Sequence, residues 1–148
     1  MERYIIWDVD GTVVDTRRAI AQSYLYALKH VGVEESDGTR VYPFVGRRST
    51  LVFSECHGLS GEPLAAAIEK EGIELCALYP GMGELLSVLR SRGARMSVAS
   101  ARSHRQLTML FDRLRIGHAF DCVFATETDH KAADKPKLVG DCIAFMGA

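Results

Sequence analysis

Two aspartates one residue apart, Asp8 and Asp10, are the residues of this sequence best suited to chemistry. They follow the short apolar run 4–7 and precede Gly11 and Thr12. A buried strand would carry both carboxylates from its carboxyl end into a crevice. Neighbouring carboxylates repel each other, so such a pair requires a cation, a phosphate-bound metal or a shared proton. The alternative is an ordinary strand exit with solvated aspartates.

The elements that must position these carboxylates are predicted from hydrophobic spacing. Residues 15–78 are expected to be rich in helix, without a convincing strand. After Pro80 the pattern changes to helix, strand, helix, strand and helix, with strands at 95–100 and 120–125 and a last helix from Lys135. This order predicts an α/β protein, a three-layer parallel sheet with helical crossovers. Ligands of such sheets bind beyond the carboxyl ends of the strands, where both aspartates, Ser100 and the loop before Lys135 fall.

Composition sets the broad class. A chain of 148 residues with 47% hydrophobic and 25% charged residues is expected to be a soluble globular domain, alone or with a small insertion. A net charge of -1 gives no electrostatic case for binding nucleic acid or a membrane surface. We find no membrane-length apolar run and no signal peptide, so a cytoplasmic location is expected. The four cysteines, at 56, 76, 122 and 142, have no metal-binding spacing and are expected to be reduced.

The run Asp8-Val9-Asp10-Gly11-Thr12 resembles the D-x-D-G-T signature of the haloacid dehalogenase (HAD)-like hydrolase superfamily. The resemblance is to its capped phosphatase branch, which includes phosphoglycolate phosphatases and β-phosphoglucomutase-like proteins. It implies a Rossmann-like core with a helical cap inserted after the first motif. The expected boundaries are 1–15 and 79–148 for the core and 16–78 for the cap.

Two further motifs of this family are matched downstream. The apolar strand that ends in Ser100 resembles the second motif, in which a hydroxyl and the N–H of the next residue, Ala101, bind a phosphate oxygen. A helix-capping serine is the alternative, and Ser97 is a weaker match because it lies in mid-strand. The third motif is a lysine after a loop, which Lys135 matches because a proline follows it; Lys131 is the competitor.

The resemblance implies a Mg²⁺-dependent phosphatase that acts on a small phosphorylated metabolite. An aspartate carboxylate is ionised at neutral pH, so Asp8 would attack phosphorus and form an aspartyl-phosphate. Asp10 would donate a proton to the leaving alcohol and then accept one from water. Lys135 and Mg²⁺, with Asp8 and Asp10 as metal ligands, would offset the negative charge.

Substrate-binding roles are implied for a few more residues: Gly11, Thr12, Ala101 and Arg47. Arg47 matches a cap Gly-Arg that contacts an anionic group of the substrate in some relatives, although a solvated basic turn is at least as good an interpretation. Arg102, which follows the second motif closely, is a weaker candidate for the same contact.

The resemblance is incomplete at the C-terminal end. The family's fourth motif, which supplies further acidic metal ligands, normally lies some twenty residues or more beyond the lysine, and Asp141 imitates it only in letters. The C-terminal part of the core is therefore expected to be missing: either the sequence is a piece of a longer protein, or the protein has lost its last sheet strands and part of its metal site. In the second case we expect an uncovered sheet edge through which another chain could pair. A sugar phosphomutase with the same intermediate, or a catalytically impaired binding or regulatory protein, stays open as an alternative.

Overall fold

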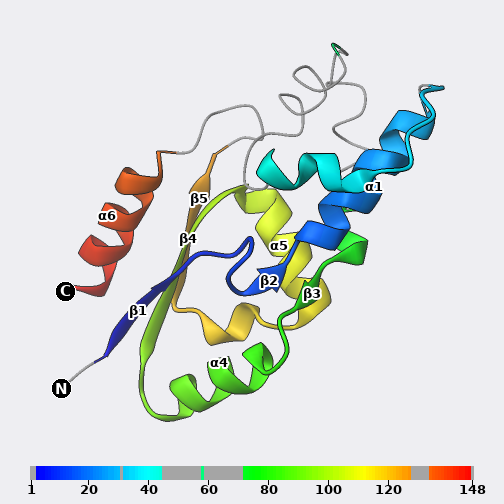
Figure 1. The fold of residues 1–148 in the computed structure, drawn as a ribbon. Coiled ribbons are helices and arrows are strands. Elements are labelled where there is room, and N and C mark those ends of the chain that lie inside the picture. Colours follow the sequence, from blue (N-terminus) through cyan, green and yellow to red (C-terminus); the bar gives the residue numbers. More distant parts are fainter. Residues whose placement is uncertain (1–2, 31, 45–57, 59–71, 128–133, 148) are drawn as a thin grey trace. The chain divides into compact units, whose positions relative to one another are not determined.

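The computed structural model describes residues 3–30, 32–44, 58, 72–127 and 134–147. Figure 1 shows the order of the elements along the chain. Their bounds are β1 Tyr4–Trp7, β2 Val14–Asp15, α1 Arg17–His30, η1 Gly38–Phe44, β3 Ala77–Leu78, α4 Met82–Ser91, β4 Arg95–Ser103, α5 His104–Leu114, η2 Gly117–Ala119, β5 Cys122–Thr126 and α6 Lys135–Met146.

The chain divides into two compact units. Unit 1 contains residues 1–14 and 78–148, and unit 2 contains residues 15–77. This division falls one residue earlier than the predicted boundaries at each crossing. In unit 2, α1 packs on η1, and their close approach depends on Gly38, where an added Cβ would lie 3.0 Å from the carbonyl oxygen of Ala21.

Unit 1 is built on a three-stranded parallel sheet in the order β1-β4-β5. The β-branched and aromatic residues of β1, Tyr-Ile-Ile-Trp, favour a strand. Its register on β4 runs from Tyr4 opposite Arg95 to Trp7 opposite Val98. Because the strands are parallel, all three carboxyl ends lie at the same edge of the sheet, and Asp8 follows the end of β1 directly.

Helices cover both faces of this sheet, as Figure 1 shows, with α6 on one side and α4 and α5 on the other. On the α6 side, the buried residues Leu138 and Cys142 form a cluster with Ala99 of β4. On the other side, α5 packs against β4 and β5 and buries Leu107 and Leu110. The α/β class and the parallel three-layer core predicted from the sequence are therefore confirmed.

Capping side chains fix where the two helices next to the strand ends begin. Ser103 and Gln106 form a capping box at the start of α5, each accepting a hydrogen bond from the other's backbone N–H. Asp134 caps α6 by accepting from the N–H of Lys137, and Pro136 lies in the first turn, where a missing N–H costs nothing. Lys135 is thereby held as the first residue of α6.

The structure differs from two of the predictions about the elements. β4 continues to Ser103 instead of ending at Ser100, because a register shift after Ala99 lets the chain bulge and pair again at Ser103. The stretch 15–78 was expected to contain no convincing strand, but residues 77–78 form strand β3, which pairs with β2 at Val14–Asp15. A two-residue strand has too few side chains to show an alternating pattern.

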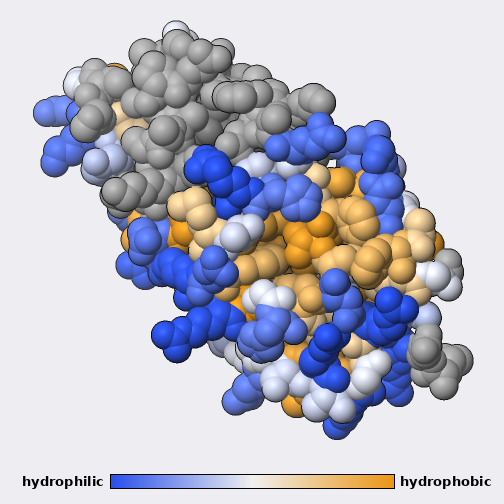
Figure 2. Space-filling model, turned by 180° about the vertical axis from the view of Figure 1, so that it is seen from behind, coloured by the Kyte–Doolittle hydropathy of each residue, from blue (hydrophilic) through white to orange (hydrophobic). Residues whose placement is uncertain are grey.

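Hydrophobic residues reach the surface over a continuous area in Figure 2, and hydrophilic residues flank them. Exposed apolar residues of unit 1 include Ile143 and Phe145 of α6, which are 42% and 51% exposed. Among the described residues, β1 is hydrogen-bonded to β4 alone, so its other edge has no strand partner there. Pairing of this edge with another chain stays a prediction.

The described cysteines, Cys76, Cys122 and Cys142, are free thiols, and Cys56 lies outside the described residues. Burial raises the pKa of the Cys142 and Cys122 thiols, which keeps them protonated. In the part of the chain that is described, no helix combines the length and the apolar content needed to cross a membrane.

Candidate active site

A tight turn at the end of β1 presents the two aspartates. The carbonyl of Val9 accepts hydrogen bonds from the N–H groups of Val13 and Val14, both at 3.0 Å, and the Gly11 N–H donates to the carbonyl of Val14 at 2.9 Å. Gly11 adopts φ +77°, a conformation that glycine reaches without steric cost. The three valines are fully buried. The core thus anchors the turn, and the carboxylates on either side of Val9 are held by a fixed backbone.

Asp8 forms an ion pair with Lys135, although the two residues are 127 positions apart in the sequence. The Lys135 ammonium donates to Oδ1 of Asp8 at 2.5 Å, and the N–H of Val9 donates to the same oxygen at 2.9 Å. Both hydrogen bonds that Asp8 makes to described residues therefore use Oδ1, and Oδ2 accepts none from them. The side chains are 45% and 39% exposed, so this pair is open to an incoming ligand.

Asp10 is paired with Arg102. Nε of Arg102 donates to both carboxylate oxygens, at 3.1 and 2.9 Å, and Nη2 donates to Oδ1 at 2.7 Å. This side-on fork is among the stronger ion-pair geometries in proteins. The side chains are only 15% and 17% exposed, which makes the pair far less accessible than Asp8 and Lys135.

Ser100 lies in the bulged part of β4 and is fully buried. Its Oγ accepts a hydrogen bond from the N–H of Arg102 at 3.2 Å. Ala101 beside it is exposed, and its carbonyl accepts a hydrogen bond from the Thr126 hydroxyl at 3.3 Å. Ser100 therefore lies within the irregular part of β4, three residues before the strand ends at Ser103.

The structure joins the four predicted catalytic residues into two ion-paired groups at this edge. Asp8 contacts Lys135, while Asp10 and Ser100 are linked through Arg102. Gly11 and Thr12 lie in the turn after Asp10. Two further sequence candidates, Arg47 and Lys131, lie outside the described residues.

The role of Arg102 as the partner of Asp10 was missed in the sequence, where it was considered only for contact with substrate. Charge balance could have revealed it, because the carboxylates of Asp8 and Asp10 each need a positively charged partner and Lys135 supplies only one. Asp141, the sequence's imitation of a fourth motif, lies on α6 and forms an ion pair with Lys137 at 2.7 Å.

The two aspartates offer carboxylate oxygens, the ligands that Mg²⁺ prefers. The donor set therefore fits this ion in kind. Within the described ranges there is no group of three or more His, Cys, Asp or Glu residues placed to hold a metal. Asp8 and Asp10 are accordingly the residues through which the described part of the chain could contribute to a magnesium site.

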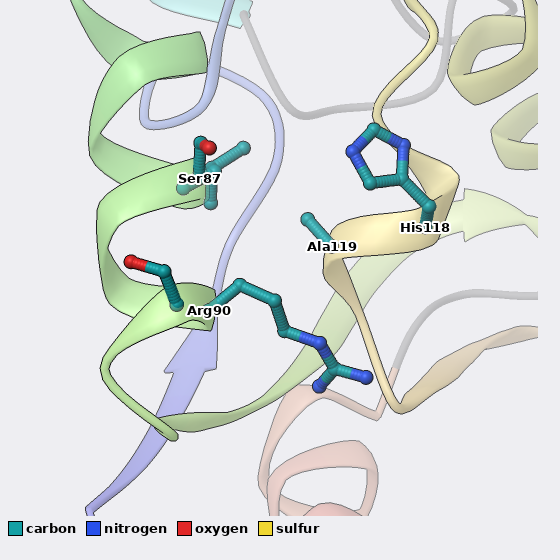
Figure 3. Close-up of a pocket in the computed structure, with 6 residues that line it drawn as sticks. Ser87, Arg90, His118 and Ala119 are labelled. Carbon is teal, nitrogen blue, oxygen red and sulfur yellow. The ribbon is translucent and has the colours of Figure 1, made fainter.

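A separate hollow of about 260 Å³ lies between α4 and η2, lined among others by Ser87, Arg90 and His118 (Figure 3). It contains none of the predicted site residues. Arg90 at its margin forms an ion pair with Asp121 at 2.5 Å, and Asp121 also accepts from the N–H of Met96 at 2.8 Å. Burial raises the pKa of Asp121, but these hydrogen bonds and the positive charge of Arg90 outweigh it and lower the pKa overall. The group serves the structure, since it ties α4 to β4.

Comparison with known proteins yields relatives along nearly the whole chain. The chain is 28% identical to the tyrosine-protein kinase PtkA of Mycobacterium tuberculosis over 96% of its length, and 26% identical to a 5'-nucleotidase of Pseudomonas aeruginosa over 91%. It spans 50% and 64% of these relatives' own lengths. A crystal structure described as a predicted phosphatase from Clostridium acetobutylicum aligns with a TM-score of 0.77 and 22% identity, over 99% of this chain and 71% of that one.

A family model described as haloacid dehalogenase-like hydrolase matches residues 5–143. This range includes both ion-paired groups and the whole parallel sheet except Tyr4, the first residue of β1. The resemblance inferred from the D-x-D-G-T run is therefore confirmed at the level of the family. The chain belongs to the haloacid dehalogenase-like hydrolase family.

Proposed function

We propose that this protein is a Mg²⁺-dependent phosphatase that hydrolyses a small phosphomonoester through an aspartyl-phosphate on Asp8. The observation that carries the proposal is the contact between the Lys135 ammonium and Oδ1 of Asp8 at 2.5 Å. A carboxylate with one oxygen held by two donors keeps a fixed orientation, and its other oxygen, which accepts no hydrogen bond from the described residues, is available for attack on phosphorus. The family description and the relatives named as 5'-nucleotidase and phosphoglycolate phosphatase support hydrolysis of a phosphate ester.

Each residue has a distinct part in this reaction. Oδ2 of Asp8 attacks the phosphorus atom, and the bond from phosphorus to the ester oxygen breaks. Lys135 reduces the repulsion between the carboxylate and the phosphoryl oxygens. Asp10 donates a proton to the departing alcohol and afterwards accepts one from the water that cleaves the aspartyl-phosphate, a positioned transfer worth roughly 10²- to 10⁴-fold.

Ser100 and Ala101 are proposed to contact the phosphoryl group, with Gly11 and Thr12 lining the turn beside it. A magnesium ion held by Asp8 and Asp10 would supply positive charge against the phosphoryl oxygens. We also propose that residues 16–78, with Arg47, serve as the cap that selects the leaving group. Caps of this kind exclude water and contact the part of the substrate that is not transferred.

Asp8→Asn tests the proposal directly. The amide cannot form the acyl phosphate, so release of phosphate from p-nitrophenyl phosphate with Mg²⁺ should fall to the background rate. Asp112→Asn, an exposed aspartate on α5, is the matched control and should keep full activity. Turnover that survives Asp8→Asn would reject Asp8 as the nucleophile.

A further inference from the structure

The bulge in β4 leaves the residues of the second motif without regular pairing in the sheet. Ala99 is paired with Phe124 of β5, and the next pair along the strands is Ser103 with Thr126. Residues 100–102 therefore lie opposite a single residue of β5 and have no partner in the register of the described sheet. Backbone groups that the sheet does not hold must be held by other contacts. In this stretch the contacts come from two side chains.

Hydroxyl groups hold the backbone of residues 100–102 at two points. Oγ of Ser100 accepts a hydrogen bond from the N–H of Arg102 at 3.2 Å, which closes a turn between a serine side chain and the backbone two residues further on. The hydroxyl of Thr126 donates to the carbonyl oxygen of Ala101 at 3.3 Å. The two bonds hold opposite sides of one planar peptide unit, the unit that joins Ala101 to Arg102. This unit cannot rotate unless one of the bonds breaks.

The turn also fixes the direction of the N–H of Ala101. That N–H lies within the ring of atoms that the hydrogen bond between Ser100 and Arg102 closes. Ser100 is fully buried and Ala101 is exposed, so an incoming phosphate ester reaches Ala101 more readily. A backbone N–H stabilises the charge of a transferred group best when its direction is fixed before the substrate binds.

Thr126 is well placed to hold this turn. It is the last residue of β5 and is 8% exposed, so water competes little for its hydroxyl. Its branched side chain has few rotamers, and its backbone is fixed by the pairing with Ser103. We propose that Thr126 is a positioning residue that holds the turn at residues 100–102, so that the N–H of Ala101 meets a phosphoryl oxygen. The inference rests on the proposed phosphatase function and adds to it a residue outside the three motifs.

Substitution of Thr126 tests this role. Thr126→Val removes the hydroxyl and keeps the branched shape, and it should lower kcat for p-nitrophenyl phosphate with Mg²⁺ roughly 3- to 10-fold, the loss expected for one hydrogen bond, with KM unchanged. Thr126→Ser keeps the hydroxyl and should restore most of the rate. Thr108→Val is the matched control, because it removes a hydroxyl that donates to the carbonyl of His104 at 3.0 Å on α5. A hydroxyl that serves the fold alone would lower kcat only in proportion to the unfolded fraction, which urea denaturation measures.

A binding measurement separates this inference from the proposed function. The probe is orthovanadate with Mg²⁺, an oxyanion similar in shape and charge to phosphate, and calorimetry should show roughly 3- to 10-fold weaker binding to Thr126→Val but not to Thr126→Ser. If the native protein hydrolyses the ester and Thr126→Val equals it in kcat and in vanadate affinity, the positioning role is wrong and the phosphatase proposal stands. If the ester is not hydrolysed but Thr126→Val alone weakens vanadate binding, the phosphatase proposal is wrong and the turn serves oxyanion binding. If the native protein neither hydrolyses the ester nor binds vanadate, both are wrong.

Discussion

Replacing Lys135 tests whether its ion pair with Asp8 serves folding or catalysis. We expect the replacement to change the free energy of unfolding little and to lower kcat strongly. The perturbation is Lys135→Gln, which keeps length and polarity but removes the charge. Two unit charges about 4 Å apart attract by about 4 kcal/mol at the effective dielectric constant of a protein surface. Here the side chains are 39% and 45% exposed, and exposed pairs contribute about 0–1 kcal/mol to stability after solvent screening.

The position of Lys135 in its helix reduces that contribution further. Lys135 is the first residue of α6, where the N-terminal end of the helix dipole disfavours a cation by about 0.3–1 kcal/mol. The two effects are similar in size and opposite in sign. We therefore expect Lys135→Gln to change the free energy of unfolding by less than about 1 kcal/mol, as measured by urea denaturation.

Turnover should respond very differently. In the proposed reaction, Lys135 faces negative charge that develops as phosphorus is attacked, and removing one such preorganised group typically costs about 10²- to 10³-fold in kcat. Hydrolysis of p-nitrophenyl phosphate with Mg²⁺ is the assay. Lys137→Gln is the matched control, since it removes a lysine two residues away that is paired with Asp141 at 2.7 Å. It should leave kcat unchanged and have little effect on stability, because the pair that it removes is exposed to solvent.

The reasoning fails in either of two ways. If Lys135→Gln retains full turnover, the contact with Asp8 has no part in the reaction. If it instead lowers stability by several kcal/mol and activity falls only in proportion to the unfolded fraction, the pair is structural. A large loss of kcat in a protein with a native unfolding curve is the only result that supports the proposed role.

Two further predictions concern the frame around the site. Asp121→Asn should destabilise the protein by about 1–3 kcal/mol at neutral pH, because the carboxylate accepts charged hydrogen bonds from Arg90 and from the Met96 N–H. Since folding lowers the pKa of Asp121 below its ordinary 3.8, this contribution is complete above pH 3.8 and disappears as pH falls through the lower folded-state pKa. Urea denaturation of both proteins between pH 2 and 7 should therefore converge at the acid end, and a difference independent of pH would contradict the assignment. Gly11→Ala meets no atom within 4 Å but must adopt φ +77°, so it should cost about 1–2 kcal/mol. The strain should also disturb Asp10 and lower kcat more than a stability loss explains, whereas Gly140→Ala on α6, where an added Cβ also meets nothing, should not lower kcat.

The sequence predicted the parts of this fold that repeat a pattern. The apolar run before Asp8 and the spacing on α5 and α6 were sufficient for the parallel sheet and its helical crossovers, because burial on one face enforces periodicity. Lys135 was also identified correctly as the start of the last helix, since Pro136 behind it is typical of a first turn. Features that depend on one pair of residues on neighbouring strands have no periodic pattern. The end of β4 was therefore placed three residues too early, because its last residue, Ser103, pairs with Thr126 only after a register shift.

The pairing of Asp10 with Arg102 shows why the site itself was only partly predictable. The two residues are separated by 92 positions, and their contact depends on a β4 bulge that no periodic pattern encodes. Family resemblance assigns a role to Asp10 but says nothing of what holds it when substrate is absent. Burial supplies that information in part: a carboxylate that is 15% exposed must have a cationic or hydrogen-bonding partner. Burial therefore predicts that Asp10 has a partner, whereas the identity of that partner depends on the bulge in β4 and is seen only in the structure.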